Sequence, residues 1–98
     1  MLFLARFGPH ADKPDVFKAS LEPHLEYLRQ KADAVPLSAT MRETEDAPAY
    51  GFVWLVKADS REEAERICKD DPFYQAGLRT SFELYHLTKA LPDVMASI

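Results

Sequence analysis

Residues 50–58, YGFVWLVKA, carry the clearest strand pattern in the sequence. Side chains alternate along an extended chain, so Phe52 and Trp54 fall on one side of it. Val53 and Leu55 fall on the other side. β-Branched and aromatic residues favour strands. Because the stretch is apolar on both sides, we expect a strand whose two faces are both covered by other parts of the protein.

Further strands and a helix are predicted around this segment. The other strand patterns are residues 1–7, 35–42 and 80–88. Residues 14–33 instead have apolar side chains at steps of three and four, the spacing of one side of a helix. Pro23 interrupts this pattern. Either the helix is kinked at Pro23, or a second helical segment begins near Ser20.

A second helix is predicted over residues 61–69. Ser60 followed by Glu63 forms a capping box, in which the two side chains bind free backbone N–H groups at the start of a helix. The sequence Asp-Asp-Pro at residues 70–72 ends the helix, because proline cannot continue it. Residues 73–78 read as a short turn before the last strand.

The order of these elements, βαββαβ, is typical of an α+β fold with a ferredoxin-like sheet, in which both helices cross one face. Two helices leave the second face of the sheet uncovered. That face would expose more apolar surface than soluble monomers usually show. We therefore expect a homodimer with twofold symmetry, packed sheet face to sheet face as a dimeric α/β barrel.

The length and charge of the chain restrict its partners. A chain of 98 residues has room for a single domain, here residues 1–98 with a core over residues 1–90 and a C-terminal tail over residues 91–98. The net charge of -4 gives no attraction for nucleic acid or an anionic membrane. The longest apolar run, residues 51–56, is far below the roughly 20 residues that span a bilayer.

The single cysteine and the first residues of the chain bear on its location. One cysteine cannot form a disulfide within the chain, and the sequence MLFLARFGPH lacks the pattern of a signal peptide. We therefore expect a cytoplasmic protein. Cys68 has no basic group at helical spacing, which predicts a buried and unreactive thiol.

Three motifs carry a family resemblance. They are PHLEYL at residues 23–28, SREEA at residues 60–64 and DPFYQAGL at residues 71–78. Together they resemble the YCII-related (YciI-like) family, from the first strand to about Ala90. The resemblance implies a dimeric α/β-barrel fold and a proposed His-Asp active site, which carries over to His24 and Asp71. It also implies a likeness to muconolactone isomerase-like and dehydrochlorinase-type proteins of aromatic breakdown.

Residues 38–41 depart from the family pattern. Relatives commonly have Ala-Gly followed by Pro or Ser and Leu on the second strand, whereas this chain reads Ser-Ala-Thr-Met. It therefore lacks the glycine that lets a backbone lie close to a ligand. This difference bears on whether the relatives' substrate carries over to this chain.

The candidate catalytic pair also has structural interpretations. His24 borders the apolar side of its helix, which suits a catalytic imidazole, a core histidine or a surface histidine. Asp71 stands before Pro72 at a helix end, where aspartate is an ordinary turn former. An aspartate bonded to an imidazole fixes its tautomer and stabilises its charged form. The resemblance favours the catalytic interpretation.

Four further side chains are candidates for substrate binding: Arg6, Tyr27, Trp54 and Phe73. Arg6 either binds a carboxylate or reaches solvent at the strand end. The three aromatic residues either line a pocket or pack in the core or an interface. The histidines lack the spacing of metal ligands, and no glycine-rich phosphate loop is present. We expect no metal and no cofactor.

Two functions fit this sequence. The first is a small-molecule enzyme, a cofactor-independent lyase or isomerase that uses His24 and Asp71 on an aromatic or lactone-like metabolite. The second is a non-catalytic metabolite-binding or accessory dimerisation module, which the missing glycine favours. The sequence leaves this choice open, and it specifies neither substrate nor reaction.

Overall fold

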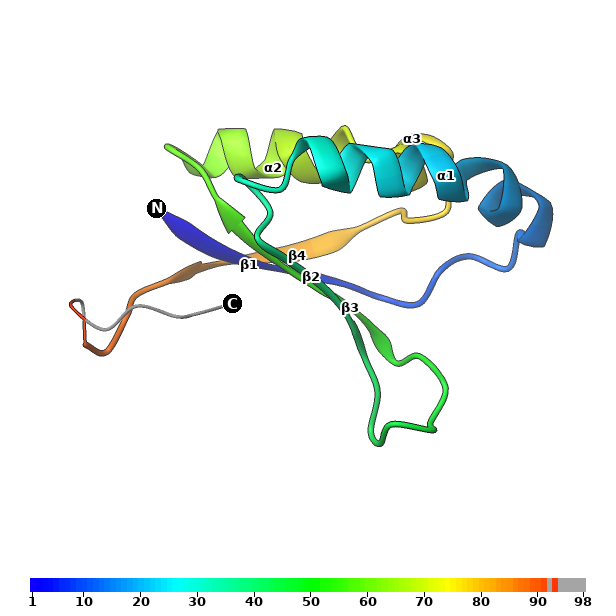
Figure 1. Cartoon of the computed structure of the whole chain (residues 1–98), viewed down its shortest axis with the longest axis horizontal. Helices are drawn as coiled ribbons and strands as arrows, with labels where there is room; N and C mark the ends of the chain where they lie inside the picture. Colours follow the sequence, from blue (N-terminus) through cyan, green and yellow to red (C-terminus); the bar gives the residue numbers. More distant parts are fainter. Residues whose placement is uncertain (92, 94–98) are drawn as a thin grey trace.

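A computed structural model describes residues 1–91 and 93 of the chain. A four-stranded antiparallel sheet carries three helices on one face (Figure 1). The strands are β1 (Leu2–Phe7), β2 (Leu37–Met41), β3 (Gly51–Lys57) and β4 (Phe82–Leu87). The helices are α1 (Pro14–Gln30), α2 (Arg61–Lys69) and α3 (Pro72–Gln75). The expected α+β, ferredoxin-like order is confirmed, and α3 is an addition to it.

The two helix predictions have different outcomes. Helix α1 continues through Pro23 as one segment, so no second segment begins near Ser20. Helix α2 has the predicted bounds. The hydroxyl of Ser60 accepts the N–H of Glu63 at 3.1 Å, as a capping residue does. None of the helices in the described ranges is long and apolar enough to cross a membrane. The expected tail, residues 91–98, falls outside the described residues except for Leu91 and Asp93.

Strand β1 occupies an inner position in the strand order β2-β3-β1-β4 and pairs with both β3 and β4. Ala5 of β1 stands opposite Trp54 of β3 and Leu84 of β4. These residues share the face that the helices cover, and all three are buried. At the end of β3, a Cβ atom on Gly51 would lie 2.6 Å from the carbonyl oxygen of Phe7. Glycine is therefore needed for β1 and β3 to approach at that end.

The opposite side of the sheet, hereafter the open face, has no helix over it in Figure 1. Its half-buried apolar residues include Leu2, Leu4, Val53 and Leu55. Arg6 also lies on this face, where its Nη2 donates to Glu83 Oε1 at 2.6 Å, and both side chains are about half exposed. Arg6 therefore contacts both Glu83 and solvent, and its role in substrate binding stays a prediction.

Candidate functional site

A buried hydrogen bond joins His24 to Asp71 between the helices and the sheet. His24 is the buried residue of α1, and its Nδ1 lies 2.6 Å from Asp71 Oδ1. The side chains of His24 and Asp71 are 7% and 0% exposed. Helices α1 and α3 contact each other (Figure 1), which brings together two motifs that are 47 residues apart.

Asp71 is held by its position at the start of α3. As the N-cap of that helix, its Oδ1 accepts the backbone N–H of Phe73 at 3.2 Å. Pro72 follows in the first helical position, where proline is favoured. The second carboxylate oxygen, Oδ2, accepts a hydrogen bond from Arg79 Nη1 at 3.0 Å. Both oxygens of Asp71 therefore have protein partners.

The third member of this group, Arg79, is itself buried, with 5% of its surface exposed. Gly77, with φ 79°, ends α3 in the left-handed conformation that glycine readily adopts, and Arg79 follows two residues later. The guanidinium carbon lies 4.3 to 5.6 Å from the centres of four aromatic rings, those of Phe7, Phe52, Phe73 and Trp54. Burial lowers the pKa of Arg79, and the carboxylate of Asp71 opposes this effect.

Aromatic rings pack on both histidines of this region. The imidazole of His24 stacks on Phe73, with ring centres 3.8 Å apart and an angle of 7° between the planes. His10, from the loop before α1, stacks on Phe52 at 4.3 Å. Its Nε2 is buried and has no hydrogen-bond partner among the described residues. Burial, together with the positive charge of Arg79, lowers the pKa of His10 to about 4. His10 is therefore a neutral imidazole at pH 7.

The remaining candidates for substrate binding occupy different places. Phe73 lies against His24, as described above. The indole of Trp54 is fully buried near Arg79. The hydroxyl of Tyr27 donates to the carbonyl oxygen of Ile67 at 2.6 Å, so Tyr27 faces α2. Arg6 lies on the open face, away from this group. A role in substrate binding stays a prediction for all four.

Sequence reasoning did not identify Arg79 or single out His10 as part of this site. Arg79 is one arginine between a turn and a strand, and no spacing distinguishes it from a surface arginine. His10 has no metal-ligand spacing to the other histidines, and no other pattern in the sequence distinguishes it. In the described part of the chain, no group of three or more His, Cys, Asp or Glu residues could hold a metal ion. The thiol of Cys68 is buried, and burial raises its pKa to about 12, as expected for an unreactive cysteine.

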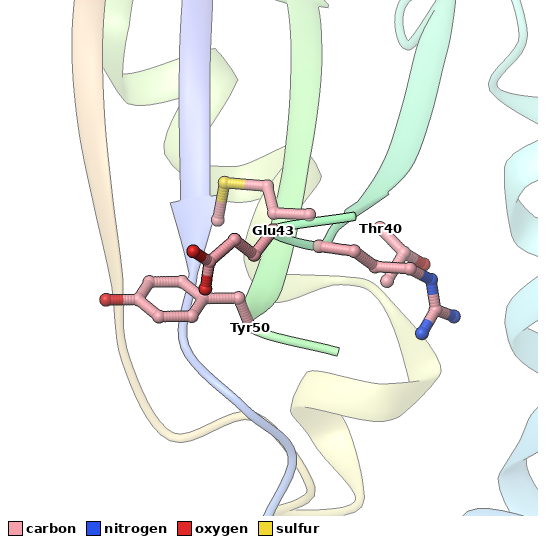
Figure 2. A pocket seen from close by; sticks show the side chains of 5 residues that line it. Thr40, Glu43 and Tyr50 are labelled. Atoms are coloured by element: carbon pink, nitrogen blue, oxygen red, sulfur yellow. The ribbon is translucent and has the colours of Figure 1, made fainter. Parts of the chain in front are cut away.

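A separate cavity of about 570 Å³ lies at the loop between β2 and β3. It is lined by Thr40, Met41, Arg42, Glu43 and Tyr50, and Figure 2 shows their side chains around the hairpin. Tyr50 is 77% exposed, and the polar residues of this lining are exposed as well. Neither His24 nor Asp71 contributes to this cavity. It is therefore distinct from the buried pair.

The geometry of the pair determines what His24 can do. An ionised Asp71 only accepts hydrogen bonds, so Nδ1 of His24 carries the proton of their shared bond. The opposite nitrogen, Nε2, then has a free lone pair, and no described residue bonds to it. A neutral imidazole in this tautomer can accept a proton at Nε2. The arrangement is therefore suited to proton transfer at Nε2.

Comparison with known proteins relates this chain to one fold and one family. The structure is similar to that of a 5-chloro-2-hydroxyhydroquinone dehydrochlorinase (TftG) from Burkholderia phenoliruptrix AC1100, in complex with 2,5-dihydroxybenzoquinone. The TM-score is 0.74 at 21% sequence identity, over 90% of this chain and 94% of that chain. The likeness shows a shared fold. Comparison with curated proteins finds no match. Residues 1–88 match the YCII-related domain, and the chain therefore belongs to this family.

Proposed function

We propose that this protein is a cofactor-independent lyase or isomerase that acts on an aromatic or lactone-like metabolite. The observation that carries the proposal is the buried 2.6 Å contact between His24 and Asp71. A buried carboxylate whose two oxygens are both bonded cannot rotate freely, so the imidazole is held in one orientation. The fold shared with a dehydrochlorinase supports a reaction that begins with loss of a proton from a small molecule.

In the proposed reaction, Nε2 of His24 removes a proton from the substrate. The electron pair left behind forms a double bond, and in a lyase the leaving group departs with its own electron pair. In an isomerase, the same Nε2 returns the proton to another atom. Asp71 keeps Nδ1 protonated and stabilises the imidazolium that forms. Phe73, which stacks on the imidazole, limits its rotation.

We also propose that the protein is a cytoplasmic homodimer that buries the open face. The half-buried Leu4 and Leu55 of this face support the proposal, because apolar residues of adjacent strands lie side by side there. Light scattering should give twice the chain mass of 11.1 kDa. Leu55→Asp should give the mass of one chain while circular dichroism stays unchanged. A single-chain mass for the unaltered protein at micromolar concentration would contradict the dimer.

The catalytic proposal is tested first by finding a ligand. A thermal-shift screen with aromatic acids, quinones and lactones identifies compounds that bind the folded protein, since such binding raises the melting temperature. Each hit is then incubated with the protein and analysed for a product. His24→Ala should lower the rate of conversion by about 10²- to 10⁴-fold, the usual contribution of general acid–base catalysis.

His86→Ala is the matched control, because His86 is exposed on β4. It should convert the ligand at the rate of the unaltered protein. Full activity in His24→Ala would contradict the proposed mechanism. A ligand that raises the melting temperature of the unaltered protein, but that it never converts, would instead support the non-catalytic binding module.

A further inference from the structure

Arg79 lies in a site where burial of its charged side chain costs free energy. Its side chain is 3% exposed and makes one ion pair, with an Asp71 side chain that is 0% exposed. The Nε atom of Arg79 is buried and has no hydrogen-bond partner within residues 1–91 and 93. Four aromatic rings fill the remaining space around the guanidinium.

Stability alone does not account for this arginine. Removing two charges from water usually costs more than their attraction returns, and apolar residues of similar volume often replace a buried ion pair without loss of stability. The site is already rich in aromatic rings, so apolar side chains in place of both Asp71 and Arg79 would suit its surroundings, whereas an apolar residue at position 79 alone would leave Asp71 buried without its cation. What the arginine adds is a fixed positive charge and a donor directed at Asp71.

The charges of the neighbouring groups indicate how Arg79 affects the protonation of His24. His24 bonds Asp71, and Asp71 in turn bonds Arg79. His10 and Tyr27 also lie near this pair, and both are uncharged at pH 7. Cys68, which lies near Arg79, is also uncharged. With Arg79 present, the negative charge of Asp71 is already balanced when His24 is neutral. Without Arg79, protonation of His24 would be the simplest way to balance the buried carboxylate.

We propose that Arg79 is a positioning residue for the His24–Asp71 pair. Its guanidinium holds Asp71 in the orientation that meets Nδ1 of His24, and its charge keeps His24 neutral, so that Nε2 is free to accept a proton. This inference rests on the proposed function, since a neutral His24 matters only if it acts as a base. The charge relation itself can be measured without any substrate.

The first experiment follows the ring signals of His24 by NMR as pH changes. In Arg79→Met, which removes the charge and keeps an apolar chain of similar length, the titration midpoint of His24 should rise by about 1 unit or more. Arg79→Lys, which keeps the charge, should stay within about 0.3 unit of the unaltered protein. The matched control is Arg29→Met, which removes an exposed arginine from the same helix as His24 and should also leave the midpoint unchanged. An unchanged midpoint in Arg79→Met would overturn the proposal.

A second measurement needs no variant and applies even if Arg79→Met does not fold. Nitrogen-15 chemical shifts of the unaltered protein at pH 7 should show His24 as a neutral imidazole with its proton on Nδ1. An imidazolium at this pH, or a proton on Nε2, would overturn the proposal.

Activity separates this inference from the proposed function. Once a convertible ligand is known, Arg79→Met should move the acidic limb of the pH–rate profile, where protonation of His24 stops the reaction, to higher pH. The shift should equal the rise in the NMR midpoint. Arg79→Lys should restore the profile. If no ligand is ever converted but the NMR results hold, the proposed function fails and the charge relation stands. If His24→Ala abolishes conversion but the titration midpoint of His24 is unchanged in Arg79→Met, the positioning role fails and the proposed function stands.

Discussion

The two faces of the sheet use the same kinds of residue in opposite ways. On the face covered by the helices, Val56 is fully buried, and the ion pair between Asp71 and Arg79 is closed off from water. On the open face, Val53 is half-buried, and the ion pair between Arg6 and Glu83 is about half exposed. An ion pair in a water-poor site interacts far more strongly than one in solvent. The difference shows that burial, and not residue type, distinguishes the two faces: the covered face shields its ion pair from water, and the open face leaves its ion pair in solvent.

The largest contrast is expected from breaking each ion pair. Asp71→Ala leaves the guanidinium of Arg79 buried without its carboxylate and should lower the free energy of unfolding by about 3–5 kcal/mol. Glu83→Ala leaves Arg6 in contact with water, so its effect should be far smaller and should decrease further in high salt. Urea unfolding of the three proteins measures both effects. Equal losses in the two variants would mean that the covered ion pair is no less hydrated than the exposed one.

A smaller difference in the free energy of unfolding is expected when one valine on each face is replaced by alanine. Val56→Ala removes two buried methyl groups and should cost about 2 kcal/mol in the free energy of unfolding. Val53→Ala should cost roughly half as much or less in dilute protein, because Val53 keeps part of its surface in water. The cost of Val53→Ala should grow with protein concentration if the open face is buried in a dimer. A cost that is independent of concentration over the range where the mass doubles would exclude Val53 from the interface.

A further contrast concerns pH and compares a covered histidine with an exposed one. The pKa of His10 is about 4 in the folded protein and 6.5 for an ordinary histidine, so the unfolded chain binds its proton first as pH falls. The stability that neutral His10 provides is therefore fully present above pH 6.5 and is lost as pH falls towards 4. His10→Gln should flatten the fall in melting temperature over this range. His86→Gln changes an exposed residue and should keep the dependence of melting temperature on pH seen in the unaltered protein. An equal dependence in all three proteins would mean that His10 does not cause the loss of stability.

Periodicity in the sequence explains which elements could be predicted. Strands and helix α2 have enough residues for a repeat of two or of three and four to be visible, and their positions agree with the structure. Helix α3 has four residues, about one turn, so residues 73–78 read as a turn instead. The sequence around Pro23 is compatible with a kinked helix and with a second helical segment that begins near Ser20. In the structure α1 is one helix that includes Pro23.

The site was predictable only where residues carry a motif. His24 and Asp71 were identified because a family pattern joins them, and the structure places their side chains 2.6 Å apart. Arg79 became visible only through its contact with Asp71, which depends on how α3 ends. His10 became visible through its ring contacts with Phe52. Single residues in loops have no period, so their burial follows from the folded chain and not from local sequence.

Strand β1 is made before both of the strands with which it pairs. Its inner position means that residues 51–57 and then 82–87 must leave the ribosome before its two edges are satisfied. During that interval, its apolar side chains and unpaired backbone are available to other chains. The pairing of β1 is therefore complete only when nearly the whole domain has been synthesised. A slower rate of translation through the β4 codons would lengthen that interval and increase the demand for chaperones.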